Sequence, residues 1–253
     1  HHRLYEFAKK ALIKIFVSPY ASVCDLYCGD TDKWDEAQIG HYIGVDREIW
    51  ESQRKPYTAE FCELDPSVED LGSLLHDKDI VCCLQHLQLC FENEERARSL
   101  LHNVSSLLKP GGYFFGITPD SSTIWTKYQK IVEASHNKVQ NCIRSDNFVI
   151  TFEVEEEKFP FFGKKYMLKF ANDHCLVHFP SLIRLAREAG LEYVEIQNLA
   201  EFYDDNRAQF AGMLNFLDPR GKLLARSFDI LGLYSIFVFQ KSDPDASPPI
   251  LTP

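Results

Sequence analysis

Short apolar runs alternate with helical patterns in the first half of the chain. Such runs, each closed by a polar or glycine-containing stretch, predict β-strands that are buried on both faces. A helix is expected over residues 4–16, and strands are expected over 22–26, 41–45, 57–64, 79–84 and 113–117. This alternation predicts a parallel sheet with helices on both faces.

The clearest helix lies between the fourth and fifth apolar runs. Its apolar side chains recur at i, i+3, i+4 and i+7, at Ala97, Leu100, Leu101, Val104, Leu107 and Leu108. The stretch Lys109-Pro110-Gly111-Gly112 follows immediately. Because proline and glycine interrupt helices, this stretch predicts the end of the helix and a turn.

The second half of the chain has a different pattern. Residues 148–154 and 166–170 are expected to form antiparallel strands around a turn region at 160–165. A short helix over 180–189 and two late strands over 193–196 and 234–240 follow. We therefore expect one α/β domain over 1–253, with an antiparallel insertion at 143–180 and a flexible, proline-rich tail at 242–253.

Composition and charge narrow the function. The chain has 253 residues, 45% of them hydrophobic, and a formal net charge of −10. A protein that follows a long stretch of RNA phosphates usually carries the opposite charge. Any nucleic-acid substrate is therefore expected to be held at one nucleotide or at an end, although acidity also simply aids solubility.

The eight cysteines do not indicate a metal centre. No two of them form a Cys-x-x-Cys pair, and the pair Cys24 and Cys28 lies far along the chain from His174 and His178. We therefore expect no metal, reduced thiols and an intracellular protein. Neither a signal peptide nor an apolar run long enough to span a bilayer is found, so no membrane association is expected.

Acids and an amide stand at the ends of successive predicted strands. Asp25 lies in the first strand, Asp46 ends the second, Asp65 follows the third, and Gln85 follows the fourth. Doubly wound folds bind nucleotides at the carboxyl ends of their strands, where an acid holds the ribose hydroxyls. Each acid alone is more often a helix cap or a loop carboxylate, but the set favours a nucleotide-type cofactor.

The loop after the first strand is poor in glycine. Close approach of a cofactor to backbone favours residues without a Cβ, yet this loop offers Gly29 alone, with Tyr27 where a first glycine would be expected. Either the site is degenerate or loop residues are missing from the sequence, and we favour the second explanation. Because Gly-x-Gly-x-x-Gly is absent, a hydride-transfer dinucleotide enzyme is disfavoured.

Motifs spread over nearly the whole chain form a set. They begin with Asp25-Leu26-Tyr27-Cys28-Gly29 and Asp30-Thr31-Asp32-Lys33-Trp34, and they continue at 108–114, 118–121, 159–166, 178–182, 201–205 and 234–239. This set resembles the eukaryotic mRNA cap guanine-N7 methyltransferases. The resemblance implies a class I, Rossmann-like, S-adenosylmethionine-dependent fold with a mostly parallel seven-stranded sheet and an antiparallel last strand.

The resemblance also implies roles for individual residues. S-adenosylmethionine contacts fall on Lys9, Tyr27, Asp46, Asp65 and Gln85, and the residues that shape the same pocket are Asp25, Gly29 and Asp30. Cap contacts fall on Lys33, Glu92 and Tyr234, with His86 and His174 near two further family contacts. Taken alone, the lysines are typical of a solvated surface and Tyr234 and His86 of a core.

The chain departs from the family pattern at three places. A paired asparagine of the family falls on Tyr5 and Glu6, its histidine and tyrosine fall near 86–89 with one residue fewer, and its guanine-reading glutamate falls at or just before His174. The implied activity is methyl transfer from S-adenosylmethionine to guanine N7, leaving S-adenosylhomocysteine. No general base is nominated, because N7 already carries a lone pair.

Two rival functions stay open at this point. A class I methyltransferase acting on a small molecule or a protein would share the first-half motifs. A non-catalytic protein with the same fold, serving as a scaffold, would explain Tyr27 and the single loop glycine. For the cap enzyme we expect other capping or transcription proteins as partners, RNA binding through the cap, and a nuclear location.

Overall fold

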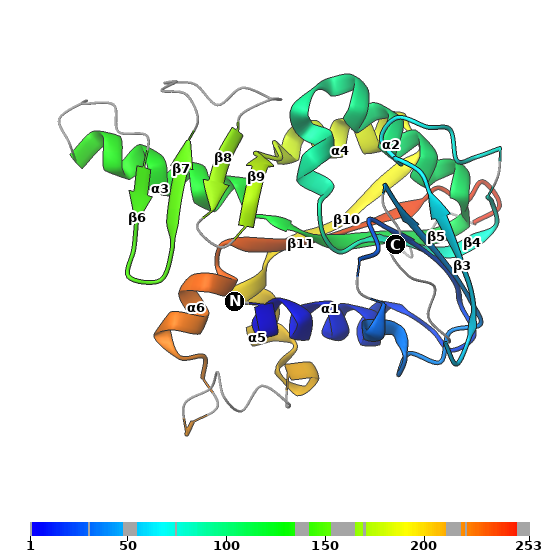
Figure 1. Ribbon diagram of the computed structural model, residues 1–253, viewed down its shortest axis with the longest axis horizontal. Coiled ribbons are helices and arrows are strands. Elements are labelled where there is room, and N and C mark those ends of the chain that lie inside the picture. The colour runs from blue at the N-terminus through cyan, green and yellow to red at the C-terminus, as the bar shows by residue number, and fades with distance from the viewer. Residues whose placement is uncertain are drawn as a thin grey trace, which may run out of the picture.

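A seven-stranded sheet forms the centre of the molecule (Figure 1). The computed structural model describes residues 2–29, 31–47, 55–73, 75–134, 142–152, 165–168, 171–210, 219–220 and 222–246. The strand order is β10-β11-β5-β4-β1-β2-β3, with β1 Ser22–Leu26, β2 His41–Asp46, β3 Thr58–Glu63, β4 Lys78–Cys83, β5 Leu108–Pro119, β10 Leu191–Asn198 and β11 Tyr234–Lys241. Neighbours among β1 to β5 pair in parallel, and β11 pairs antiparallel with both β5 and β10. This arrangement confirms the expected fold class.

Helices cover both faces of the sheet. In Figure 1, α1 His2–Phe16 and α5 Leu199–Asp205 lie on one face, and α2 Glu94–Leu107 and α4 Phe179–Glu188 lie on the other. Within β11, Ile236 and Val238 join the core beneath α1, whereas Phe237 and Phe239 join the core beneath α2. Because both faces are buried, the strand is a continuous apolar run.

The ends of α2 follow from its sequence. The Asn93 side chain accepts a hydrogen bond of 2.9 Å from the Arg96 N–H, so it caps the first turn. At the other end Leu108 is extended and begins β5. The predicted turn at Pro110 to Gly112 is wrong: the stretch belongs to β5, where a register shift against β4 accommodates Gly111 at φ +81.

A second, four-stranded antiparallel sheet is inserted between β5 and α4. Its order is β6 Cys142–Arg144, β7 Val149–Phe152, β8 Lys165–Leu168 and β9 Ala171–Cys175. The helix α3 Ser121–Ala134, which the sequence analysis did not predict, packs Tyr128 on Phe152 with ring centroids 4.7 Å apart. That the segment 143–180 helps form a cap pocket stays a prediction.

Backbone hydrogen bonds fix the first residues after β11. The Ser242 N–H donates to the Gly190 carbonyl at 3.1 Å, and the Ala246 N–H donates to the Asp243 carbonyl at 3.2 Å. The rest of the predicted tail, 247–253, lies outside the described residues. In the described part of the chain, no helix is long and apolar enough to cross a membrane.

Candidate functional site

The carboxyl ends of β4, β1, β2 and β3 meet at one edge of the sheet, because these strands are adjacent and parallel. Asp46 ends β2 and accepts a 3.4 Å hydrogen bond from the Gly29 N–H after β1. Gln85 follows β4, and its side-chain amide donates to the Tyr27 carbonyl at 3.0 Å. The predicted strand-end residues therefore come together around the loop after β1.

Lys9 reaches this edge from α1. Its ammonium lies 2.8 Å from a Glu6 carboxylate oxygen and 3.2 Å from the Gln85 side-chain oxygen. Burial lowers the pKa of Lys9, and the charge of Lys33 lowers it further, against the opposing effect of Glu6. The helix thus delivers a buried cation to the end of β4, as the resemblance implies for a cofactor contact.

The loop after β1 is tightly constrained. Gly29 has φ +50, and a Cβ at this position would lie 2.3 Å from the Gln85 side-chain nitrogen, so glycine fits both the backbone and the close approach. Tyr27 also has positive φ, 53°, which is strained for a side chain of its size. Asp30, the remaining predicted loop residue, lies outside the described residues.

Tyr27 fills the space between the strand ends. Its hydroxyl lies 3.4 Å from an Asp65 carboxylate oxygen and 3.5 Å from the Cys90 sulfur. Burial raises the pKa of Tyr27 strongly, so the hydroxyl stays protonated. The ring meets that of His86 edge to face at 6.2 Å, and His86 itself has φ 69. Two strained residues on neighbouring strand ends thus face each other.

Asp65 is held as a carboxylate. Burial raises its pKa, but hydrogen bonds from the Ser67 hydroxyl at 2.7 Å and the Ser67 N–H at 3.0 Å, with the charge of Arg47, outweigh that effect and lower it. The Arg47 side chain lies 3.8 Å from Asp65 and 6.0 Å from the Tyr27 ring centre. Sequence reasoning missed Arg47, although it directly follows Asp46.

Asp25 and Lys33 form a buried pair beneath the loop. Their nearest charged atoms are 3.1 Å apart, and both side chains are 1% exposed. Asp25 also accepts hydrogen bonds of 3.0 Å from the Trp34 indole and 2.9 Å from the Tyr42 hydroxyl. The Lys33 ammonium donates to the Cys28 carbonyl at 2.8 Å. Lys33 therefore faces the interior here, and its assignment to the cap stays a prediction.

The predicted cap residues lie around the same edge. Tyr234 begins β11 opposite Pro119 and meets the Tyr5 ring edge to face at 5.1 Å. The Tyr5 hydroxyl donates to the Leu84 carbonyl at 2.6 Å, which ties α1 to the end of β4. Burial raises the pKa of Tyr234. Tyr5, which replaces a family asparagine, thus supports the ring of Tyr234.

Three further residues predicted to lie at or near the cap are Glu92, His174 and His86. Glu92 ends the 3-10 helix η2 Leu87–Glu92 and pairs with Arg96 at 3.5 Å. The strand β9 lies beside η2 and carries His174 opposite Tyr166, but the His174 side chain lies outside the described residues. Burial lowers the pKa of His86, so its imidazole is neutral near pH 7.

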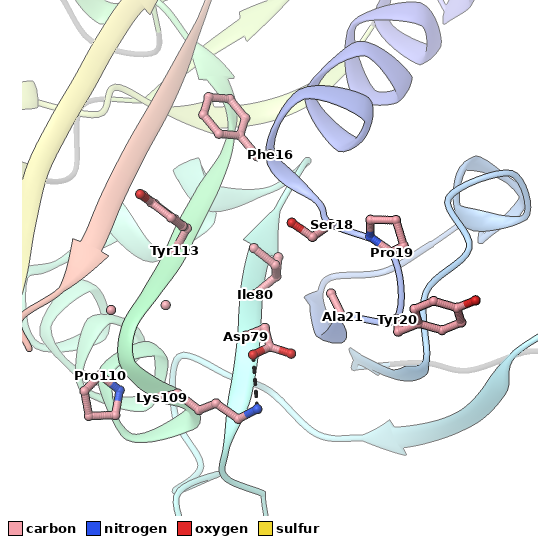
Figure 2. Close-up of a pocket in the computed structure, with 12 residues that line it drawn as sticks. Phe16, Ser18, Pro19, Tyr20, Ala21, Asp79, Ile80, Lys109, Pro110 and Tyr113 are labelled. Carbon is pink, nitrogen blue, oxygen red and sulfur yellow. Dashed lines mark hydrogen bonds and ion pairs between the residues drawn. The ribbon is translucent and has the colours of Figure 1, made fainter.

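An open cavity occupies the opposite edge of the sheet (Figure 2). It has a volume of about 470 Å³ and is lined at the amino ends of β4 and β5 by Asp79, Ile80, Lys109 and Tyr113, with Tyr20 from the segment before β1. Ligands of parallel sheets bind at the carboxyl ends of the strands, so this cavity is not the candidate cofactor site. Within the described ranges, no cluster of metal-ligating side chains that could hold an ion is found.

Solved structures with the same fold are S-adenosylmethionine-dependent methyltransferases. A putative enzyme from Listeria monocytogenes aligns with a TM-score of 0.57 at 11% identity, over 95% of this chain and 99% of its own. The Burkholderia thailandensis 1,6-didemethyltoxoflavin-N1-methyltransferase aligns with a TM-score of 0.53 at 14% identity, over 94% and 79%. At such identities these likenesses establish the fold alone.

Sequence relatives are much closer. An mRNA cap guanine-N(7) methyltransferase 2 from Oryza sativa subsp. japonica is 71% identical over 283 residues, which covers all of this chain and 84% of the relative. The protein of that name from Arabidopsis thaliana is 63% identical over all of this chain and 80% of its own length. Because the first alignment spans 283 residues and this chain has 253, about 30 positions of the relative have no counterpart here.

The profile of the mRNA (guanine-N(7))-methyltransferase domain matches residues 2–242 of the chain. This match runs from α1 to the end of β11 and so includes every strand of the central sheet. The chain therefore belongs to the mRNA (guanine-N(7))-methyltransferase family.

Proposed function

We propose that the chain transfers a methyl group from S-adenosylmethionine to N7 of the guanosine that caps the 5′ end of mRNA. The observation that carries this proposal is the 71% identity to a cap methyltransferase over the whole chain. The convergence of Asp46, Asp65 and Gln85 around the loop after β1 adds a physical basis.

The residues at the carboxyl edge fit the cofactor. We assign the Asp46 carboxylate at the end of β2 to the ribose hydroxyls, and Asp65 to the adenine amino group. Gly29 provides backbone that no Cβ obstructs, and Lys9 and Gln85 lie beside it for the methionine part. When bound, S-adenosylmethionine supplies an electrophilic methyl group on a positively charged sulfur.

The chain has little chemistry to perform on guanine itself. N7 already carries an in-plane lone pair, so no base is required, and alignment of the two reactants is the main contribution. Tyr234, supported by Tyr5, offers an aromatic wall for the purine. The neutral imidazole of His86 adds hydrogen-bonding capacity without placing a positive charge beside a ring that is gaining one.

Charge and partners are consistent with a substrate held at its end. With a net charge of −10, the protein repels a long phosphate backbone, so recognition concentrates on the cap nucleotide. Glu92 and His174 remain proposed cap contacts on the resemblance. We further propose a nuclear location and association with other capping or transcription proteins, which imaging of a tagged chain and co-purification test.

A methyl-transfer assay tests the proposal. Labelled S-adenosylmethionine is incubated with GpppG, with GTP, with m7GpppA and with small-molecule acceptors, and the product is digested and identified by chromatography. We expect N7-methylguanosine from GpppG and no transfer to m7GpppA, whose only guanine N7 is already occupied. Transfer only to small acceptors indicates a different methyltransferase, and cofactor binding without transfer to any acceptor indicates a scaffold.

A further inference from the structure

One peptide unit links the buried Lys33–Asp25 pair to Asp46, the carboxylate proposed to bind the cofactor. The Cys28 carbonyl accepts a 2.8 Å hydrogen bond from the Lys33 ammonium. The N–H of the next residue, Gly29, belongs to the same planar peptide unit and donates to the Asp46 carboxylate at 3.4 Å. Because a peptide unit is rigid and planar, fixing its oxygen also fixes the direction of its N–H.

The ammonium that holds this oxygen is itself anchored. Lys33 lies in the 3-10 helix η1 Asp32–Trp34, 3.1 Å from Asp25, and neither side chain is exposed by more than 1%. Asp25 receives further hydrogen bonds from Trp34 and Tyr42. Burial alone would lower the pKa of Lys33, but Asp25 outweighs burial and raises it, so the ammonium is charged.

The Asp46 carboxylate is in turn oriented by backbone. One oxygen accepts from the Gly29 N–H and the other accepts from the Arg47 N–H at 2.7 Å. Gly29 needs this support because glycine, which has no Cβ, can adopt many backbone conformations besides the observed φ of +50. A lysine buried under the loop therefore controls the direction of a carboxylate on its surface.

We infer that Lys33 is a positioning residue for the cofactor site, holding the Cys28–Gly29 peptide so that Asp46 faces the ribose hydroxyls, rather than a contact to the cap. This inference rests on the proposed function for its ligand. The structural part of it, the restraint of one peptide unit, exists without any ligand and is measured separately.

The test compares three variants with the parent chain. Lys33→Met keeps the length of the side chain and removes its ammonium. Lys55→Met is the matched control, since the Lys55 ammonium pairs with Asp32 at 3.0 Å and with Asp35 at 3.2 Å. The double variant Lys33→Met/Asp25→Asn removes both charges, so that no lone buried carboxylate remains.

Amide hydrogen exchange of the ligand-free chain is the first measurement. We expect peptides covering 26–29 to exchange at least about tenfold faster in Lys33→Met than in Lys55→Met, because a charge-assisted hydrogen bond is lost. Calorimetry is the second, with an expected rise of about tenfold to a hundredfold in the Kd for S-adenosylmethionine and an unchanged KM for GpppG. The double variant should regain thermal stability without regaining cofactor affinity.

Opposite results overturn the inference. A raised KM for GpppG with unchanged cofactor affinity places Lys33 at the cap, and recovery of cofactor affinity in the double variant leaves it a purely stabilising role. A parent chain that binds cofactor but does not methylate GpppG refutes the proposed function and leaves this inference standing. A parent chain that binds no cofactor also refutes the function, and hydrogen exchange then decides the role of Lys33 alone.

Discussion

Each edge of the central sheet carries a lysine–aspartate pair, which is buried at one edge and exposed at the other. At the carboxyl edge Lys33 pairs with Asp25 at 3.1 Å with both side chains 1% exposed, whereas at the amino edge Lys109 pairs with Asp79 at 3.1 Å with side chains 47% and 43% exposed. The two pairs have the same distance but contribute differently to stability. Water solvates and screens the exposed pair, whereas each charge of the buried pair depends on the other charge and on its hydrogen-bond partners.

A strained tyrosine marks each edge as well. Tyr27 has φ 53 and Tyr20 has φ 64, but Tyr27 is 2% exposed and Tyr20 is 85% exposed. The Tyr27 hydroxyl contacts Asp65 and Cys90, whereas the backbone of Tyr20 donates to the Gln38 carbonyl at 2.8 Å. Strain persists where surrounding contacts over-determine it, and at the carboxyl edge those contacts include the proposed site residue Asp65.

The largest expected difference between the edges is in stability. Lys33→Met should lower the free energy of unfolding by about 3–5 kcal/mol, because it leaves the Asp25 carboxylate buried and unpaired. Lys109→Met should lower it by about 0–1 kcal/mol, as is usual for exposed pairs. Urea denaturation of both variants checks this, and equal losses would show that the two pairs are energetically alike.

Among the binding effects, the largest is expected from removal of Asp46, the carboxylate proposed to hold the ribose hydroxyls. Asp46→Ala is expected to raise the Kd for S-adenosylmethionine about tenfold to a hundredfold, through the loss of hydrogen bonds to a charged group. Affinity for a cap analogue should hardly change. Asp79→Ala at the amino edge is the control and should leave both affinities as they are. A cofactor Kd that Asp46→Ala does not alter would remove this acid from the site.

An intermediate effect is expected on the KM for the cap substrate when the proposed guanine contact Tyr234 is removed. Tyr234→Ala should raise the KM for GpppG about tenfold, which corresponds to the loss of one aromatic contact of about 1.5 kcal/mol. Tyr113→Ala removes a ring from the other end of the β5–β11 pairing, at the amino-edge cavity, and should leave KM unchanged. If both variants behave alike, the effect is one of packing and Tyr234 does not meet the cap.

The smallest expected effect is a pH dependence from His86. Burial holds its folded pKa below the ordinary value of 6.5, so the folded state favours the neutral imidazole. The resulting stability is fully present above pH 6.5 and is lost as the pH falls toward the folded pKa. His86→Gln should flatten the parent's decline in melting temperature between pH 7 and pH 5.5, and an equal decline in both chains would contradict the assignment.

The positions of inner strands were predictable from the sequence because both faces of these strands are buried. The apolar runs at β1 and β11 begin and end within a residue of the observed strands. The start of β5 was not predictable in this way, because Pro110 and the two glycines typify a turn. In the structure they lie inside β5, where the register against β4 shifts between the pairs Lys78–Leu108 and Ile80–Tyr113. Likewise, α3 depends on packing against the second sheet.

The site was predictable where topology alone determines position. Acids at the ends of adjacent parallel strands must share one edge, so Asp46 and Asp65 could be placed together. The direction of a side chain is different: Lys33 is typical of a surface lysine in sequence, and its burial emerges from the contacts with Asp25 and Cys28. Arg47 is placed over Tyr27 only by the folded strand ends.

A crystal structure of the chain with S-adenosylhomocysteine tests the central claim most directly. We predict the ligand at the carboxyl edge, with its ribose hydroxyls within hydrogen-bond distance of Asp46 and its adenine beside Asp65. Density for the ligand in the cavity lined by Tyr20 and Lys109, or an Asp46 carboxylate directed away from the ligand, would contradict it.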